Sequence, residues 1–368
     1  MTGSALAFFP WWDIGSPLEI DTLRLLPYVH KKQPGDLGSV AQKDIDGVLA
    51  AYSNLPRNRI TRATLLEING WRAGLDPDGF LDAIFDAREM IAFSALSERK
   101  LFFGSSSYCS FDTFSLVVQR YDSLAPERFA YSTRKRDGGT TNLWTSREFG
   151  FRRPLHVSQH DRPVLNQGLL KTLLVSRKSH WFDAIRDFNR ANTDSNDISP
   201  HVELIMMKSA FESLLEIGEK RIDFERSLQR VLLGIEPENG RSGPLREKWN
   251  SRVKKERPLL AWAHDFCDMR GSAAHGGHRR HSRFVWSEHA HLAFASILFP
   301  LLLKKIASDE GVFDLNVEDV ETLRRIDRYV LFDPFARTES VRDKHPWSQI
   351  SEEISLAKIA AVLRARRL

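Results

Sequence analysis

Residues 258–277, PLLAWAHDFCDMRGSAAHGG, predict one helix with a clear beginning and a clear end. Pro258 suits the first helical position because an amide proton there would find no partner anyway. The double glycine at 276–277 is a strong stop signal. At 100° per residue, one stripe of this helix combines Arg270 with apolar side chains, namely Leu259, Ala263, Phe266 and Ala274. A guanidinium in a buried stripe is costly unless it is paired or lines a cavity, so Arg270 and the nearby His275 are candidate functional residues.

Helical periodicity continues on both sides of this segment. We expect one long or broken helix over residues 165–188 and further helices over residues 201–218, 224–235 and 287–306. Helices with apolar faces and short connections favour a bundle. The longest apolar run, within the last of these helices, has about 14 residues, whereas a membrane span needs about 20. We therefore expect a buried helix there and no membrane partner.

The beginning of the chain predicts mixed α and β structure. A helix is expected over residues 79–101, and the short apolar segments at residues 6–12 and 18–26 favour strands or extended loops. Partial alternation, with a turn at Asp137-Gly138-Gly139, predicts a small antiparallel meander. Its apolar positions are Phe111, Phe114, Leu116, Val118, Phe129, Tyr131, Leu143, Leu155 and Val157.

These patterns predict three parts. An α+β domain is expected over residues 1–158, and an all-α helical bundle over residues 159–308. A helical extension, with an amphipathic helix at residues 350–363, follows over residues 309–368. The ligand or partner of the first domain is unknown from these patterns.

The composition fits an ordinary globular protein. Of the 368 residues, 42% are hydrophobic and 27% are charged. The chain has only two cysteines, Cys109 and Cys267, which are too few for a disulfide framework or a cysteine-based zinc site. Residues 1–12 lack a basic region ahead of an apolar core, so we expect no signal peptide. A reducing, cytoplasmic location is the expectation.

Positive charge is concentrated in residues 241–283. This stretch has 11 Lys and Arg against 4 Asp and Glu, whereas the whole chain has a net charge of +5. A phosphate-binding surface needs such a local excess, although a solvated helix face has the same composition. The candidate RNA-binding residues are Lys254, Lys255, His278, Arg279, Arg280 and Arg283.

Residues 266–276, FCDMRGSAAHG, resemble the R-x4-6-H motif of HEPN domains, particularly those of the Apea-like branch. That branch has an aromatic residue, an arginine, small residues and then His-Gly. The upstream FESLL at residues 211–215 is similar to the same branch, and the resemblance extends over about residues 160–308. It implies a HEPN-like helical domain in a metal-independent endoribonuclease of a prokaryotic antiviral or toxin system. Such a protein works on RNA as a homodimer, in which the motifs of the two chains form one composite site, and it needs no cofactor. The resemblance implies that the N-terminal domain is a sensing, regulatory or RNA-guiding module.

The resemblance also assigns residue roles. Arg270 and His275 are the implied catalytic pair, with Glu212 and Ser272 in support. A histidine is suited to take the proton of a ribose 2′-OH at neutral pH, so that the 2′-oxygen attacks the adjacent phosphorus. An arginine stabilises the charge that builds on the phosphoryl oxygens. This reaction leaves a 2′,3′-cyclic phosphate.

Other interpretations stay open. The spacing R-x4-6-H occurs five times in the chain, so the surrounding residues single out the pair at Arg270 and His275. Gly271 stands where active HEPN members often have a polar residue, and an ideal helix separates the pair by about 140°. The alternative is a non-catalytic HEPN dimer that binds nucleic acid or a partner protein. A metal site is a further alternative, because histidines are concentrated at positions 275, 278, 281, 289 and 291.

Replacing both Lys254 and Lys255 with Glu should weaken RNA binding and reduce its dependence on salt. For every phosphate that the variant no longer neutralises, the slope of log affinity against log salt should fall by about 0.7 on a single strand. Fluorescence anisotropy of a labelled RNA over a salt series measures both quantities. Unchanged affinity would place the RNA elsewhere, for example along residues 134–136 and 152–153.

Overall fold

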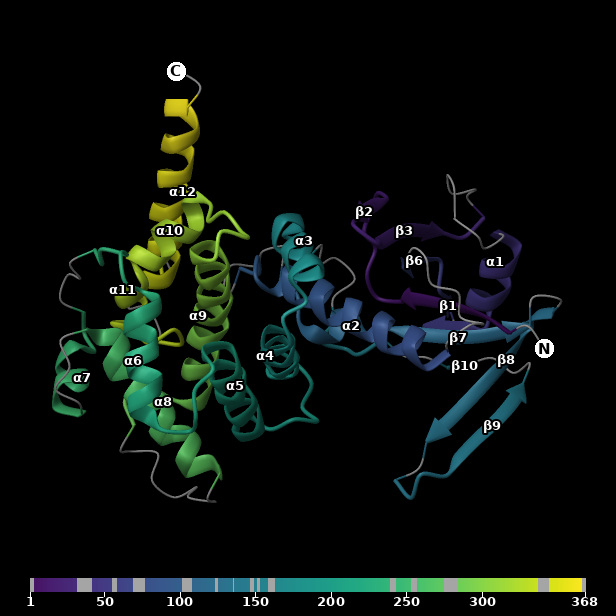
Figure 1. Ribbon diagram of the computed structural model, residues 1–368, viewed down its shortest axis with the longest axis horizontal. Coiled ribbons are helices and arrows are strands. Elements are labelled where there is room, and N and C mark those ends of the chain that lie inside the picture. Colours follow the sequence, from purple (N-terminus) through teal and green to yellow (C-terminus); the bar gives the residue numbers. More distant parts are fainter. Residues whose placement is uncertain are drawn as a thin grey trace. The chain divides into compact units, whose positions relative to one another are not determined.

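A computed structural model gives the architecture of the chain, which divides into two compact units (Figure 1). The structure describes residues 3–31, 42–54, 58–68, 77–100, 108–122, 125–134, 136–145, 149–150, 153–157, 163–238, 243–252, 257–274, 284–336 and 344–365. The N-terminal unit comprises Met1–Arg99 and Ser106–Val175, and the helical unit comprises Lys100–Ser105 and Ser176–Leu368. The predicted order, an α+β region followed by a mostly helical region, is confirmed.

A seven-stranded antiparallel sheet organises the N-terminal unit. The strands follow the order β2-β3-β6-β1-β7-β8-β9, so the first strand of the chain lies at the centre. Their bounds are β1 Gly3–Phe9, β2 Leu18–Ile20, β3 Leu23–Val29, β6 Arg62–Ile68, β7 Val117–Asp122, β8 Ala125–Arg134 and β9 Thr140–Thr145. A smaller sheet pairs β10 (Phe149–Gly150), β4 (Tyr52–Asn54) and β5 (Asn58–Arg59).

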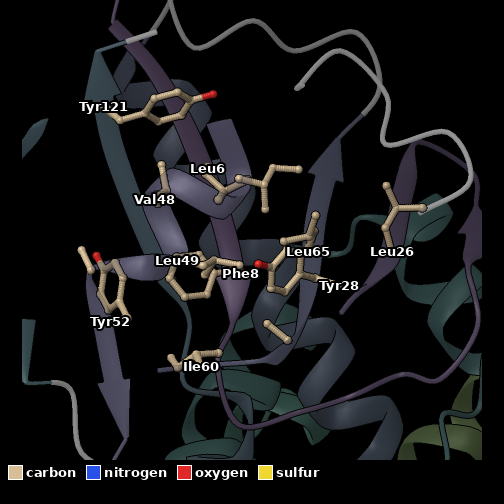
Figure 2. Packing of buried hydrophobic residues seen from close by; sticks show 13 residues of the cluster. Leu6, Phe8, Leu26, Tyr28, Val48, Leu49, Tyr52, Ile60, Leu65 and Tyr121 are labelled. Carbon is tan, nitrogen blue, oxygen red and sulfur yellow. The ribbon is translucent and has the colours of Figure 1, made fainter. Parts of the chain in front are cut away.

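One face of the large sheet packs against helix α1 (Gln42–Ala50). Figure 2 shows Leu6 and Phe8 of β1 in one cluster with Val48 and Leu49 of α1. All four side chains are buried, Phe8 and both α1 residues completely. This cluster is the core on that side of the sheet.

The opposite face of β1 is buried as well. The ring of Phe9 lies 5.4 Å from that of Trp12 and 6.4 Å from that of Phe114. Phe114 belongs to the 3-10 helix η1 (Phe111–Phe114), which packs against helix α2 (Pro77–Leu96). Because β1 is covered on both faces, its sequence is a continuous apolar run rather than an alternation.

The predicted meander is confirmed for β7, β8 and β9. Its turn lies at the predicted glycines, where Gly138 has φ +84° and the amide of Gly139 donates to Asp137 Oδ1 at 2.8 Å. Two parts of the prediction are wrong. Phe111 and Phe114 lie in η1 and not in a strand, since a spacing of three residues also suits a 3-10 helix. Leu155 and Val157 lie in a turn, where Leu155 is exposed.

The helical unit contains nine helices among the residues that the structure describes. They are α4 Ser179–Arg190, α5 Pro200–Leu215, α6 Arg221–Val231, α7 Arg246–Arg252, α8 Pro258–Ala274, α9 Glu288–Asp309, α10 Val317–Arg324, α11 Ile326–Val330 and α12 Pro346–Ala365. The predictions of α5, α6, α8, α9 and α12 are confirmed to within a few residues. The sequence patterns did not predict α7, α10 and α11.

Aromatic rings form the centre of this unit. The ring of Phe211 in α5 lies 5.3 Å from Phe224 in α6, and 6.4 Å and 6.0 Å from Trp262 and Phe266 in α8. It also lies 5.4 Å from Phe299 in α9. These four helices therefore share one core, which fixes the position of α8.

Helix α9 is the one described helix that is long and apolar enough to cross a membrane by length and composition. In the structure, 83% of its most apolar window is buried inside the helical unit. It is the core helix that its apolar sequence predicts.

The N-terminal unit extends beyond the boundary that the sequence suggested at residue 158. The backbone amide of Asn166 donates to the carbonyl of Ser94 at 3.2 Å, and its side-chain amide donates to Glu98 Oε1 at 2.7 Å. Helix α3 (Gln167–Ser176) thus begins against the end of α2 and belongs, through Val175, to the N-terminal unit. The expected broken helix is divided between the two units.

The extension expected after residue 308 is part of the helical unit. The indole of Trp347 in α12 donates to the carbonyl of Tyr329 at 3.0 Å. The carboxylate of Asp327 in α11 accepts hydrogen bonds from Arg257 Nη2 at 2.8 Å and from the amide of Leu259 at 2.9 Å. Through these bonds α11 holds the beginning of α8.

Replacing Gly243 with Ala should destabilise the helical unit by about 1–3 kcal/mol through overpacking. An added Cβ would lie 2.5 Å from Leu331 Cβ and 2.9 Å from Leu331 O, which is too close. Urea denaturation followed by circular dichroism measures the change in the free energy of unfolding. The control is Gly218→Ala, whose Cβ would meet no atom within 4 Å. An equal loss in both variants would contradict the packing explanation.

Candidate functional site

Helix α8 places Arg270 on its inner side, as the sequence predicts. Three members of the stripe, Leu259, Ala263 and Phe266, are fully buried, and 23% of the Arg270 side chain remains exposed. Ala274, at the end of the stripe, is exposed. The guanidinium therefore lies at the edge of the core, where a ligand has access to it.

The Arg270 guanidinium has few acceptors among the residues that the structure describes. Its Nη1 lies 3.9 Å from Glu219 Oε2, on a side chain that is 79% exposed. Its Nε is buried, and no described residue accepts a hydrogen bond from it. A buried donor without an acceptor is unfavourable, so this group is suited to bind an oxyanion.

Glu212, the implied supporting acid, has a different neighbour. Its Oε1 accepts a hydrogen bond from Lys208 Nζ at 2.5 Å, one turn earlier on α5. Lys208 is almost completely buried and lies 5.0 Å from the centre of the Phe224 ring. Glu212 therefore stabilises a buried ammonium group, which was not predicted although the spacing of four residues was visible in the sequence.

The other predicted site residues lie mainly outside the described residues. Ser272 is described, and it is partly buried on α8 two residues after Arg270. Positions outside the described ranges are His275, His278, Arg279, Arg280, Arg283, Lys254 and Lys255. Their parts in the site stay predictions from the sequence.

A line of charged residues runs along another side of α8. Asp268 Oδ1 accepts a hydrogen bond from Arg221 Nη1 at 2.9 Å, and Asp268 Oδ2 lies 3.6 Å from His264 Nδ1. Arg221 is the first residue of α6, so this line and the Glu219 contact both join α8 to the beginning of α6. The sequence patterns did not predict these contacts, although the spacing of four between His264 and Asp268 was a signal.

Cys267 lies between these two sides of α8. Burial raises the pKa of its thiol to about 12, with Lys208 opposing the shift and nearby carboxylates adding to it. The thiol is therefore protonated near neutral pH and is a poor nucleophile. It does not contribute a reactive group to the site.

A buried carboxylate on α8 holds the chain that follows the basic segment. Asp265 Oδ2 accepts hydrogen bonds from the amides of Val285 and Trp286 at 3.0 Å and 3.5 Å. The same oxygen lies 3.2 Å from His291 Nε2, and both side chains are fully buried. His291 is therefore a core histidine with a hydrogen-bond partner, which is the role that a histidine on an apolar helix usually has.

The histidine-rich region was the candidate for a metal site. The described part of the chain holds no group of three or more His, Cys, Asp or Glu that could bind a metal ion. Of the histidines at 275, 278, 281, 289 and 291, only His289 and His291 are described. His289 is exposed, and its ring lies 6.5 Å from that of Phe335.

Comparisons with protein-family models, curated proteins and solved structures found no match to this chain.

Replacing Gly271 with Ala should raise the stability of the helical unit by about 0.5–1 kcal/mol, because glycine is unfavourable inside a helix. A Cβ at this position would meet no atom within 4 Å. Thermal unfolding of the two proteins measures the difference. Gly311→Ala serves as the contrasting variant, since Gly311 has φ +73° and should lose stability on the same change. If Gly271→Ala were less stable than wild type, the added Cβ would be clashing with a neighbouring atom. That result would contradict the open space beside Gly271.

Proposed function

We propose that the chain is a metal-independent endoribonuclease of a prokaryotic antiviral or toxin system, acting in the cytoplasm as a homodimer. The observation that carries the proposal is the partly buried Arg270, whose Nε has no acceptor among the described residues. A phosphodiester would supply that acceptor. The resemblance of residues 266–276 to the HEPN motif supports the same chemistry.

In this proposal His275 acts as the general base and Arg270 stabilises the phosphate. His275 takes the proton of a ribose 2′-OH, and the 2′-oxygen forms a bond to the adjacent phosphorus. The bond from phosphorus to the 5′-oxygen breaks, and that oxygen leaves with a proton that the second motif of the dimer supplies. The products are a 2′,3′-cyclic phosphate and a 5′-hydroxyl. Arg270 offers a fixed fork of donors to the phosphoryl oxygens as their charge grows.

The other parts of the chain have matching proposed roles. The basic residues 241–283 bind RNA through its phosphates, mainly independently of sequence. The N-terminal unit senses a trigger, regulates the nuclease or guides RNA to it.

A non-catalytic HEPN dimer is the second candidate function. Two observations favour it. Glu212 is already bonded to Lys208, and Gly271 offers no polar atom beside Arg270. In that case Arg270 and His275 would help to bind nucleic acid or a partner protein without cleaving RNA.

Replacing His275 with Ala should slow RNA cleavage by about 10²–10⁴-fold, because the general base is lost. Fold and RNA binding should remain, since the position follows the last residue of α8 and precedes two glycines. Cleavage of an end-labelled RNA in EDTA measures the rate, and sizing checks the oligomeric state. His289→Ala is the matched control and should cleave like wild type, because His289 is an exposed histidine on another helix.

Arg270 provides the second arm of this experiment. Arg270→Lys keeps a positive charge but loses the planar fork, so cleavage should fall while folding is preserved. Cleavage by His275→Ala at the wild-type rate would refute the catalytic proposal and leave the binding function. Loss of wild-type cleavage in EDTA, with recovery on adding Mg²⁺ or Zn²⁺, would refute the metal-independent mechanism.

A further inference from the structure

The carboxylate of Glu219 lies beside the Arg270 guanidinium. Its Oε2 is 3.9 Å from Arg270 Nη1, which is longer than a hydrogen bond, so the two groups form a loose ion pair. The Glu219 side chain is 79% exposed, and Arg270 is its one ion-pair partner among the described residues. The carboxylate can therefore move away from the guanidinium without loss of packing.

The connection between α5 and α6 keeps Glu219 within reach of Arg270. It comprises residues 216–220, and both helices are fixed by the shared aromatic core. Arg221, two residues after Glu219, donates a hydrogen bond to Asp268 Oδ1 on α8 at 2.9 Å. Helices α6 and α8 lie side by side (Figure 1). The backbone of Glu219 is thus held near α8, while its side chain extends into solvent.

An oxyanion that binds Arg270 meets this carboxylate. The guanidinium has one buried donor, Nε, without an acceptor among the described residues, and its Nη1 faces Glu219. A phosphate that bonds to these donors brings a second negative charge close to the carboxylate, and the two charges repel each other. The repulsion ends when Glu219 turns into solvent. Asp268 does not compete in this way, because it already accepts a hydrogen bond from Arg221.

We propose that Glu219 competes with RNA phosphates for Arg270 and thereby lowers the RNA affinity of the site. The inference rests on the proposed function only through the role of Arg270 as a phosphate-binding group, and it requires neither His275 nor cleavage. Without RNA, Glu219 partly neutralises the guanidinium. RNA that other basic residues hold by neighbouring phosphates displaces Glu219, because the bound chain keeps a phosphate at high local concentration beside Arg270.

The first test removes the charge of Glu219 and keeps its shape. The probe is a fluorescein-labelled 2′-O-methyl RNA of ten nucleotides, which lacks the attacking 2′-hydroxyl and is not cut by the proposed chemistry. In fluorescence anisotropy at low salt, Glu219→Gln should lower the dissociation constant about two- to fivefold, as expected for the loss of a competing exposed ion pair. The gain should shrink as salt rises, because salt screens exposed charges.

Glu216→Gln is the matched control. Glu216 lies in the same connection, is exposed as well, and loses the same charge on this change. It forms no ion pair with a described residue, so the variant should bind the probe like wild type.

The second test asks whether the gain acts through Arg270. In a double-mutant cycle, Glu219→Gln should give no gain in chains that also carry Arg270→Gln, because the shared guanidinium is gone. Circular dichroism checks that each variant is folded. If the Arg270→Gln chains do not fold, the comparison of Glu219→Gln with Glu216→Gln decides alone.

The inference is overturned if Glu219→Gln binds the probe no more tightly than wild type. It also fails if Glu216→Gln gains equally, which would indicate an effect of net charge alone. A gain that persists with Arg270→Gln, or a probe that binds none of the variants, would likewise refute the competition. Cleavage of unmodified RNA is a separate measurement, so a wild-type protein that binds the probe but cuts no RNA refutes the nuclease proposal and leaves this inference standing.

Discussion

The buried carboxylate of Asp265 is the constraint on which the helical unit depends. It bonds to the amides of Val285 and Trp286 and lies beside His291, so it links α8, the segment before α9 and α9 itself. A fully buried carboxylate is tolerated only if hydrogen-bond donors surround its oxygens. The need to supply these donors fixes the positions of the three segments relative to one another. Arg270 follows Asp265 by less than two helical turns, so the same contacts set where its guanidinium emerges.

Arg270 differs from three other inward cations of this unit by the acceptors near it. Lys208 lies 2.5 Å from Glu212, Lys304 lies 2.8 Å from Asp319, and Arg257 lies 2.8 Å from Asp327. A nearby carboxylate neutralises the charge of each of these three cations. The carboxylate beside Arg270 lies 3.9 Å away, on an exposed glutamate side chain. An inward cation that has no closer acceptor among the described residues is typical of a binding group rather than of a structural one.

The sequence predicted the long helices and the inward position of Arg270, because an apolar stripe over many residues has one structural interpretation. The short elements α1 and β6 were not predicted. In the case of β6, the strand is covered on both faces, so its sequence does not alternate between apolar and polar residues. The contacts of the site were harder to predict. Arg221 and Asp268 are 47 residues apart, and only the packing of α6 on α8 brings them together. The spacing of four residues between Lys208 and Glu212 is visible in the sequence, but the sequence gives no sign that Lys208 is buried.

The central position of β1 has a consequence for how the chain folds during translation. Its two neighbours, β6 and β7, follow about sixty and more than one hundred residues later, as the registers Ala7 to Leu66 and Ala5 to Arg120 show. During synthesis the apolar strand therefore leaves the ribosome long before either partner exists. Such non-local pairing slows folding and prolongs the exposure of apolar surface. We therefore expect the N-terminal unit to depend more on a chaperone than the helical unit, in which α4 packs against its neighbour in sequence, α5.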